Sequence, residues 1–169
     1  KTILVTSSIP GEGKTTISAN LAIALARQGK KVILVDCDPR NPSVAEIFGE
    51  EQEHPGIGAV LRGDVKISDA FTRVKVGDGS YLTVMFGGEP NKDDAALLGR
   101  RQMKAFVEAV QKEADVVVLD TAPAELLVDA SLMARYVDAA LYVVRYDYTK
   151  MNRHTVLVHE RHPDAWFCV

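Results

Sequence analysis

Runs of consecutive apolar residues alternate along the chain with stretches in which apolar residues recur at helical spacing. The runs predict strands at residues 2–7, 31–35, 81–86, 116–119 and 139–144. The stretches between them predict helices, the longer ones from the turn at 11–13 up to Gly29, at 94–113 and at 128–136. Apolar runs without polar alternation are typical of strands buried on both faces. The pattern therefore predicts an α/β fold with a doubly wound, mostly parallel sheet and helices on both faces.

The segment between residues 39 and 69 carries mixed signals, with Pro and Asn turns and short apolar clusters. It predicts small surface helices at 44–48, 57–61 and 68–71. We expect strand 2–7 at the centre of the sheet, flanked by the strands that end at Asp36 and Asp120. Ligands of parallel α/β sheets bind beyond the carboxyl ends of the strands. The functional residues are therefore expected just after residues 5, 35, 86, 119 and 144.

Composition narrows the class of protein. The chain has 169 residues, of which 47% are apolar and 25% charged, and this composition is ordinary for a globular protein. Its length predicts one domain, which we expect to span residues 1–169 with a core at 1–149. The net charge of −3 makes the surface a poor general partner for nucleic acid. Two cysteines are too few for a disulfide framework or a four-thiolate zinc site. The chain opens directly into an apolar run, so we expect it to belong to a longer protein.

A glycine-rich loop at residues 8–16 (SIPGEGKTT) follows the first predicted strand and opens the first helix. Such a loop turns backbone N–H groups toward phosphates, and the helix N-terminus adds partial positive charge. Lys14 would neutralise the β- and γ-phosphates, and the Thr15 hydroxyl would ligate magnesium. Ser8 stands where the usual pattern has its first glycine. The alternative is a glycine turn that only starts a helix.

Three carboxylates follow the ends of two other predicted strands. Asp36 and Asp38 come after strand 31–35, and Asp120 comes after strand 116–119. Carboxylates placed there can hold magnesium or its waters, and one of them can take a proton from an attacking hydroxyl. The alternative is that they are turn residues that cap the following helices. Arg145, at the end of strand 139–144, is a further candidate contact to the nucleotide, and Tyr146 or Tyr148 could flank its base.

Three motifs together resemble the Walker A, A′ and B motifs of the bacterial tyrosine kinases. They are residues 6–16 (TSSIPGEGKTT), 33–40 (ILVDCDPR) and 117–123 (VVLDTAP). The resemblance covers residues 1–149 and implies a P-loop domain that uses ATP and Mg²⁺ to phosphorylate its own tyrosines. Residues 150–169 match the family poorly.

The resemblance and the strand-end positions together assign the site residues. We expect nucleotide contacts from Pro10, Gly11, Glu12, Gly13, Lys14, Thr15, Thr16 and Arg145. We expect Thr15, Asp36, Asp38 and Asp120 to serve magnesium. The catalytic residues would be Lys14, Asp36 and Asp38, with Asp36 the first choice as the base.

By the same resemblance, the complete protein would regulate capsular or exopolysaccharide synthesis and export from the cytoplasmic face of the cell membrane. It would form homo-oligomers and act with a membrane activator chain or a fused membrane domain, without nucleic acid. The alternative function is a partition or division-site ATPase, which shares the fold and hydrolyses ATP without modifying protein. Those ATPases carry a second lysine five positions before the Walker lysine, where this chain has Ile9. This difference favours the kinases.

Overall fold

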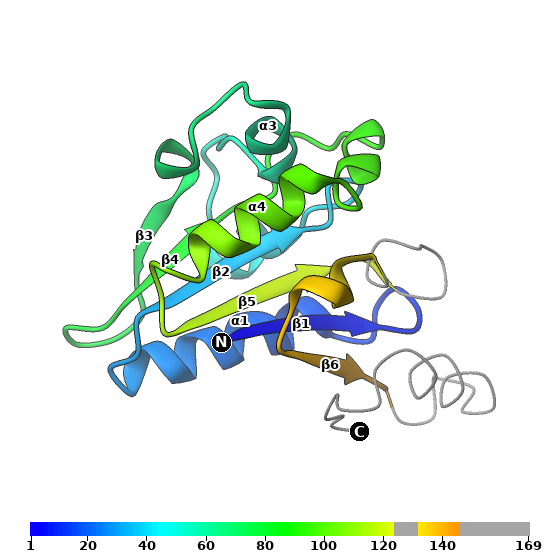
Figure 1. The fold of residues 1–169 in the computed structure, drawn as a ribbon. Coiled ribbons are helices and arrows are strands. Elements are labelled where there is room, and N and C mark those ends of the chain that lie inside the picture. The colour runs from blue at the N-terminus through cyan, green and yellow to red at the C-terminus, as the bar shows by residue number, and fades with distance from the viewer. Residues whose placement is uncertain (124–131, 146–169) are drawn as a thin grey trace.

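A six-stranded sheet organises the computed structural model, which describes residues 1–123 and 132–145 (Figure 1). The strands are β1 (Thr2–Ser7), β2 (Val32–Cys37), β3 (Thr72–Lys75), β4 (Tyr81–Met85), β5 (Val116–Thr121) and β6 (Ala139–Val143). The α-helices are α1 (Lys14–Arg27), α2 (Val44–Phe48), α3 (Ile57–Arg62) and α4 (Arg101–Val110). Short 3₁₀ helices are η1 (Ile67–Ala70), η2 (Asp93–Leu97) and η3 (Ala134–Tyr136). Within these residues, no helix combines the length and the apolar character needed to cross a membrane.

The strand order is β3-β4-β2-β5-β1-β6, and every neighbouring pair except β3 with β4 is parallel. This confirms the predicted fold class. The expected place of β1 is partly wrong: β1 is not central but second from one edge of the described sheet, between β5 and β6, and β2 lies on the far side of β5. The cause is that interior strands all bury both faces, so their apolar runs do not encode their order. The carboxyl ends still meet, because Asp120 is in register with Val5 on one side and Asp36 on the other.

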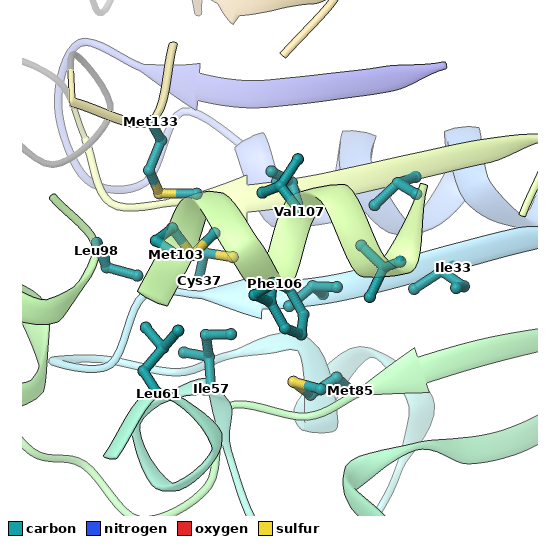
Figure 2. Close-up of a cluster of buried hydrophobic side chains, with 14 of the residues drawn as sticks. Ile33, Cys37, Ile57, Leu61, Met85, Leu98, Met103, Phe106, Val107 and Met133 are labelled. Atoms are coloured by element: carbon teal, nitrogen blue, oxygen red, sulfur yellow. The ribbon is translucent and has the colours of Figure 1, made fainter. Parts of the chain in front are cut away.

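Alternate residues of the central strands feed two hydrophobic clusters, one on each face of the sheet. Ile33 and Val117 join the cluster that α3 and α4 cover, and the next residues, Leu34 and Val118, join the cluster under α1 and α2. Figure 2 shows Met103, Phe106 and Val107 of α4 packed over the first cluster. Helices therefore cover both faces, as the sequence predicts (Figure 1).

The helix expected over 94–113 is shorter and divided. Its first part is the 3₁₀ helix η2, and α4 begins only at Arg101, after an extended backbone at Arg100. Gly99 lies at the break, and a Cβ there would come within 2.6 Å of the Leu132 side chain. The interruption lets both Leu98 and Met103 reach the core. Packing therefore overrides a periodicity that continues through the break.

Two smaller differences concern the segment between β2 and β4. The helices expected at 44–48, 57–61 and 68–71 are present as α2, α3 and η1, with shifts of one residue at some ends. The edge strand β3 was not expected. It carries Arg73 and Lys75 on exposed positions and has no apolar run, as is usual for edge strands.

Gly87 lies where the loop after β4 packs against the loop after β2. A Cβ at Gly87 would overlap Pro42 Cβ and would lie 3.1 Å from the carboxyl carbon of Asp36. We expect Gly87→Ala to lower the free energy of unfolding by about 1–3 kcal/mol, the usual cost of overpacking. Chemical denaturation measures this. Gly77→Ala is the matched control, because its Cβ would have no neighbour closer than 3.4 Å, and a change within about 0.5 kcal/mol is expected. Equal effects of the two substitutions would contradict the prediction.

Candidate nucleotide-binding site

The loop between β1 and α1 has the conformation that phosphate-binding loops need. Gly11 and Gly13 adopt φ angles of 83° and 90°, which residues with a Cβ rarely adopt. Gly13 is the N-cap of α1, and no side chain caps this helix or places a negative charge in its first turn. The N–H groups at the start of α1 are therefore available to an anion.

Asp120, at the end of β5, is buried and is bonded to the first turns of α1. The Thr15 hydroxyl donates to Asp120 Oδ2 at 2.8 Å, and the Ser18 hydroxyl lies 2.8 Å from Asp120 Oδ1. Burial raises the pKa of Asp120, while the positive charge of Lys14 and the two hydroxyl contacts oppose the rise. Asp120 thus fixes the position of Thr15, the predicted magnesium ligand.

Asp36, at the end of β2, organises the segment that follows it. Asp36 Oδ2 accepts hydrogen bonds from the backbone N–H groups of Ser43 at 2.9 Å and Val44 at 3.0 Å. Asp36 Oδ1 accepts one from the N–H of Asp38 at 3.1 Å. The side chain is fully buried. Asp36 therefore folds residues 38–44 back over the end of the sheet.

A cleft of about 550 Å³ lies between the phosphate loop and this folded segment. This is within the usual range for a small-molecule site. Its lining residues are Pro10, Gly11, Gly13, Lys14, Thr15, Thr16, Asp38, Arg40, Asn41, Ser43 and Pro123. Lys14 Nζ lies 4.0 Å from Asp38 Oδ2 and 3.2 Å from Thr15 Oγ1. The residues that line the cleft thus include two basic side chains, one carboxylate and three side chains with a hydroxyl.

The end of β6 braces the phosphate loop. Glu12 Oε2 accepts the N–H of Ile9 at 2.8 Å, and Glu12 Oε1 accepts the N–H of Arg145 at 3.4 Å. Arg145 Nη1 also lies 3.5 Å from the Gly11 carbonyl oxygen. The Tyr142 hydroxyl lies 3.0 Å from Ser8 Oγ, and Tyr142 is buried. Glu12 therefore uses its carboxylate to hold the loop and the strand end together.

The structure brings most of the expected site residues together. Lys14, Thr15 and Asp38 line the cleft, Asp120 and Asp36 lie behind it, and Arg145 lies against the loop. Tyr146 and Tyr148 lie outside the described residues. The sequence analysis missed Ser18 and Ser43. Ser18 is one helical turn after Lys14, and Ser43 starts a helix after Asn-Pro, so spacing and capping signals existed for both.

Asp36 makes the stability of the nucleotide-free protein depend on pH. Burial raises its pKa from 3.8 to about 7, and repulsion from Asp120 adds to the rise. Between pH 4 and 7 the folded chain keeps a proton there that the unfolded chain has lost, so the folded state becomes less stable as the pH rises. We expect the free energy of unfolding to fall between pH 5 and 7.5, and to fall less in Asp36→Asn. Parallel curves from urea titrations of the two proteins would contradict this.

Three comparisons identify similar proteins. The family model of the AAA domain matches residues 1–152. The tyrosine-protein kinase YwqD of Bacillus subtilis (strain 168) is 35% identical over 144 residues, which are 85% of this chain and 59% of YwqD. The kinase domain of VpsO aligns with a TM-score of 0.82 and 31% identity, over 96% of this chain and 76% of that one. The septum site-determining protein MinD of Pyrococcus horikoshii OT3, solved with Mg-ADP, aligns with a TM-score of 0.71 and 25% identity, over 85% of this chain and 57% of that one.

These similarities agree with the geometry of the cleft. The MinD structure shows that a protein of this fold binds a nucleotide with magnesium. The VpsO kinase domain is more similar than MinD in both sequence and structure. The chain spans less than two thirds of the length of YwqD. The chain belongs to the AAA domain family and, within it, to the bacterial tyrosine kinases.

Proposed function

We propose that this chain is the ATP-dependent catalytic domain of a protein-tyrosine kinase that phosphorylates its own tyrosines. One observation carries the proposal: Lys14, Thr15 and Asp38 line a single cleft, with Asp36 and Asp120 directly behind it. This is the arrangement that phosphoryl transfer needs, because its catalysis is mainly positioning and charge stabilisation. The similarity to the tyrosine-protein kinase YwqD and to the kinase domain of VpsO supports the same activity.

The residues present fit a magnesium nucleotide. Magnesium prefers oxygen ligands and keeps several of its waters, and the Thr15 hydroxyl and the carboxylates of Asp38 and Asp120 are such oxygens. Thr15 would ligate the ion directly, Asp38 and Asp120 would hold its waters, and Asp36 would support them from behind. When bound, the ion neutralises phosphate charge. The backbone N–H groups of residues 11–16 would hold the phosphates, and Lys14 would leave Asp38 to bind the β- and γ-oxygens.

A carboxylate must take the phenolic proton of the acceptor tyrosine. Asp36 is the proposed base, because a pKa near 7 suits proton transfer at neutral pH. Asp38 is the second candidate, because it lines the cleft while Asp36 lies behind it. Movement of residues 38–44 on nucleotide binding would uncover the Asp36 carboxylate for the reacting hydroxyl.

The cellular role is proposed from relatives. Tyrosine-protein kinases named CpsD, at 31–33% identity, and the putative tyrosine-protein kinase EpsB of Ralstonia nicotianae, at 31%, are among the similar proteins. We place the complete protein at the cytoplasmic face of the cell membrane in capsular or exopolysaccharide synthesis and export. It would act as a homo-oligomer with a membrane activator or a fused membrane domain. The chain would form one kinase domain, with Arg145 contributing to the nucleotide site.

A nucleotide switch like MinD is the second candidate function, because MinD shares the fold. Such a switch would release free phosphate without modifying protein. Ile9 stands where that class carries its second lysine, and the backbone N–H of Ile9 donates to Glu12. No ammonium is therefore supplied from this position of the loop, which favours the kinase.

The test is to incubate the full-length protein, with its membrane partner, with labelled ATP and Mg²⁺. Phosphotyrosine and free phosphate are then measured in the same sample. We expect phosphotyrosine to form, and to be absent when Mg²⁺ is chelated. Free phosphate without phosphotyrosine would overturn the kinase proposal and support the switch.

A further inference from the structure

Ser43 occupies the N-cap position of α2, but its side chain does not cap that helix. A serine at this position usually accepts a hydrogen bond from an N–H group of the first turn. Here the Asp36 carboxylate takes that role, because it accepts the N–H groups of Ser43 and Val44. The Ser43 hydroxyl is therefore released from capping. It lines the cleft and lies 3.0 Å from Thr15 Oγ1, 28 residues away in sequence.

The hydrogen bonds of the Thr15 hydroxyl determine which partner donates. A hydroxyl has one proton and two lone pairs. Thr15 gives its proton to Asp120 Oδ2 at 2.8 Å, because a carboxylate only accepts. The Lys14 ammonium, 3.2 Å away, only donates, so it uses one lone pair of Thr15. Ser43 must then donate to the other lone pair. The hydroxyl of Thr15 is thus fully used in this structure.

A cation can bind Thr15 Oγ1 only where a lone pair becomes free. Lys14 is expected to move to the phosphates, which frees one lone pair for the ion. A bound ion would draw electron density from this oxygen, so Thr15 would be a poor acceptor for the proton of Ser43. A water of the magnesium shell, of which the ion keeps several, offers Ser43 a better contact.

We propose that Ser43 is a positioning residue that couples the divalent cation to the segment 38–44. It holds Thr15 in the structure described here and turns to the water shell of the cation when the metal nucleotide binds. Its backbone N–H is bonded to Asp36 in this structure, so a turn of the Ser43 side chain acts on the segment that carries Asp38. This inference rests on the proposed function, because it takes Thr15 as the ligand of magnesium.

The test compares the dissociation constant of ADP in Mg²⁺ and in EDTA, measured by calorimetry, for the wild type, Ser43→Ala and Ser43→Thr. We expect Ser43→Ala to lose about threefold to tenfold of the affinity gained from Mg²⁺, because the hydroxyl exchanges a neutral hydrogen bond to Thr15 for a stronger one to a water polarised by the ion. The Mg²⁺-free affinity is expected within about twofold of the wild type. Ser43→Thr keeps a hydroxyl and is expected to retain most of the gain. Ser68→Ala, at an exposed position of η1, is the control and is expected to behave as the wild type.

Hydrogen exchange supplies a second readout that does not depend on activity. In the wild type, Mg-ADP is expected to slow amide exchange of residues 38–44 more than ADP alone does. In Ser43→Ala, Mg-ADP and ADP alone are expected to slow this exchange to the same extent. A full Mg²⁺ gain in Ser43→Ala, or equal losses of affinity with and without Mg²⁺, would overturn the inference and leave the proposed function standing. A wild-type chain that binds no ADP under either condition would overturn both.

Discussion

Lys14→Met is expected to weaken ADP and ATP binding by about tenfold to 150-fold. Lys14 is the cation of the phosphate loop, and its Nζ lies within 4.0 Å of Asp38 Oδ2 and within reach of the cleft. A hydrogen bond between an ammonium and a phosphate contributes about 1.5–3 kcal/mol, which corresponds to this range of affinity. Methionine has a similar length and no charge, so it removes the contact with little change in volume. Calorimetry with Mg-ADP measures the loss directly.

Lys104→Met is the matched control for this prediction. Lys104 lies on the exposed face of α4, where it pairs with Glu108 at 3.6 Å, and it does not line the cleft. We expect its ADP affinity to equal that of the wild type. Unchanged affinity in Lys14→Met, or an equal loss in both variants, would show that the loop at 11–16 does not hold the phosphates.

Asp36→Asn is expected to reduce tyrosine phosphorylation by about 10²- to 10⁴-fold, the usual contribution of a positioned base. The amide keeps the shape of the side chain and cannot accept the phenolic proton. It also replaces one acceptor oxygen by an NH₂ group, which affects the hydrogen bonds that fold residues 38–44. The measurement is phosphotyrosine formation in the full-length protein, with ADP affinity measured in parallel.

The pH profile separates the role of a base from the role of a loop support. With Asp36 as base, kcat/KM of the wild type rises with pH through about 7, the pKa of the free protein. A profile that keeps the same rise in Asp36→Asn, or a residual rate close to that of the wild type, would exclude Asp36 as the base. A larger loss of rate in Asp38→Asn would assign the role to Asp38.

The sequence predicts the residues of the site better than it predicts the order of the strands in the sheet. Loop chemistry is local: Gly11 and Gly13 permit positive φ angles, and Lys14 and Thr15 follow them at fixed spacing, so the phosphate loop can be read from residues 8–16 alone. The carboxylates of Asp36 and Asp120 could also be placed, because parallel strands end at one edge of a sheet. Asp36 and Asp120 lie close together because they are register partners in the neighbouring strands β2 and β5.

The features that the sequence did not predict depend on contacts between distant residues. The order of the strands follows from how β5 fits between β1 and β2. The sequence does not determine this order, because all interior strands bury both faces and therefore have similar apolar runs. The break at Gly99 depends on the approach of Leu132, which is 33 positions later in the chain. Ser43 contributes to the site only because Asp36 takes over its capping role. Each is a tertiary effect that local periodicity does not contain.

The central claim is that the cleft at the carboxyl ends of β1, β2 and β5 holds a magnesium nucleotide for phosphoryl transfer. The most direct measurement is a crystal structure of the protein with Mg²⁺ and a non-hydrolysable ATP analogue. We expect the triphosphate along residues 11–16, Lys14 Nζ on the β- and γ-oxygens, and the ion on Thr15 Oγ1 with the γ-phosphate facing Asp36 and Asp38. A nucleotide bound elsewhere, or a γ-phosphate directed away from both aspartates, would contradict the claim.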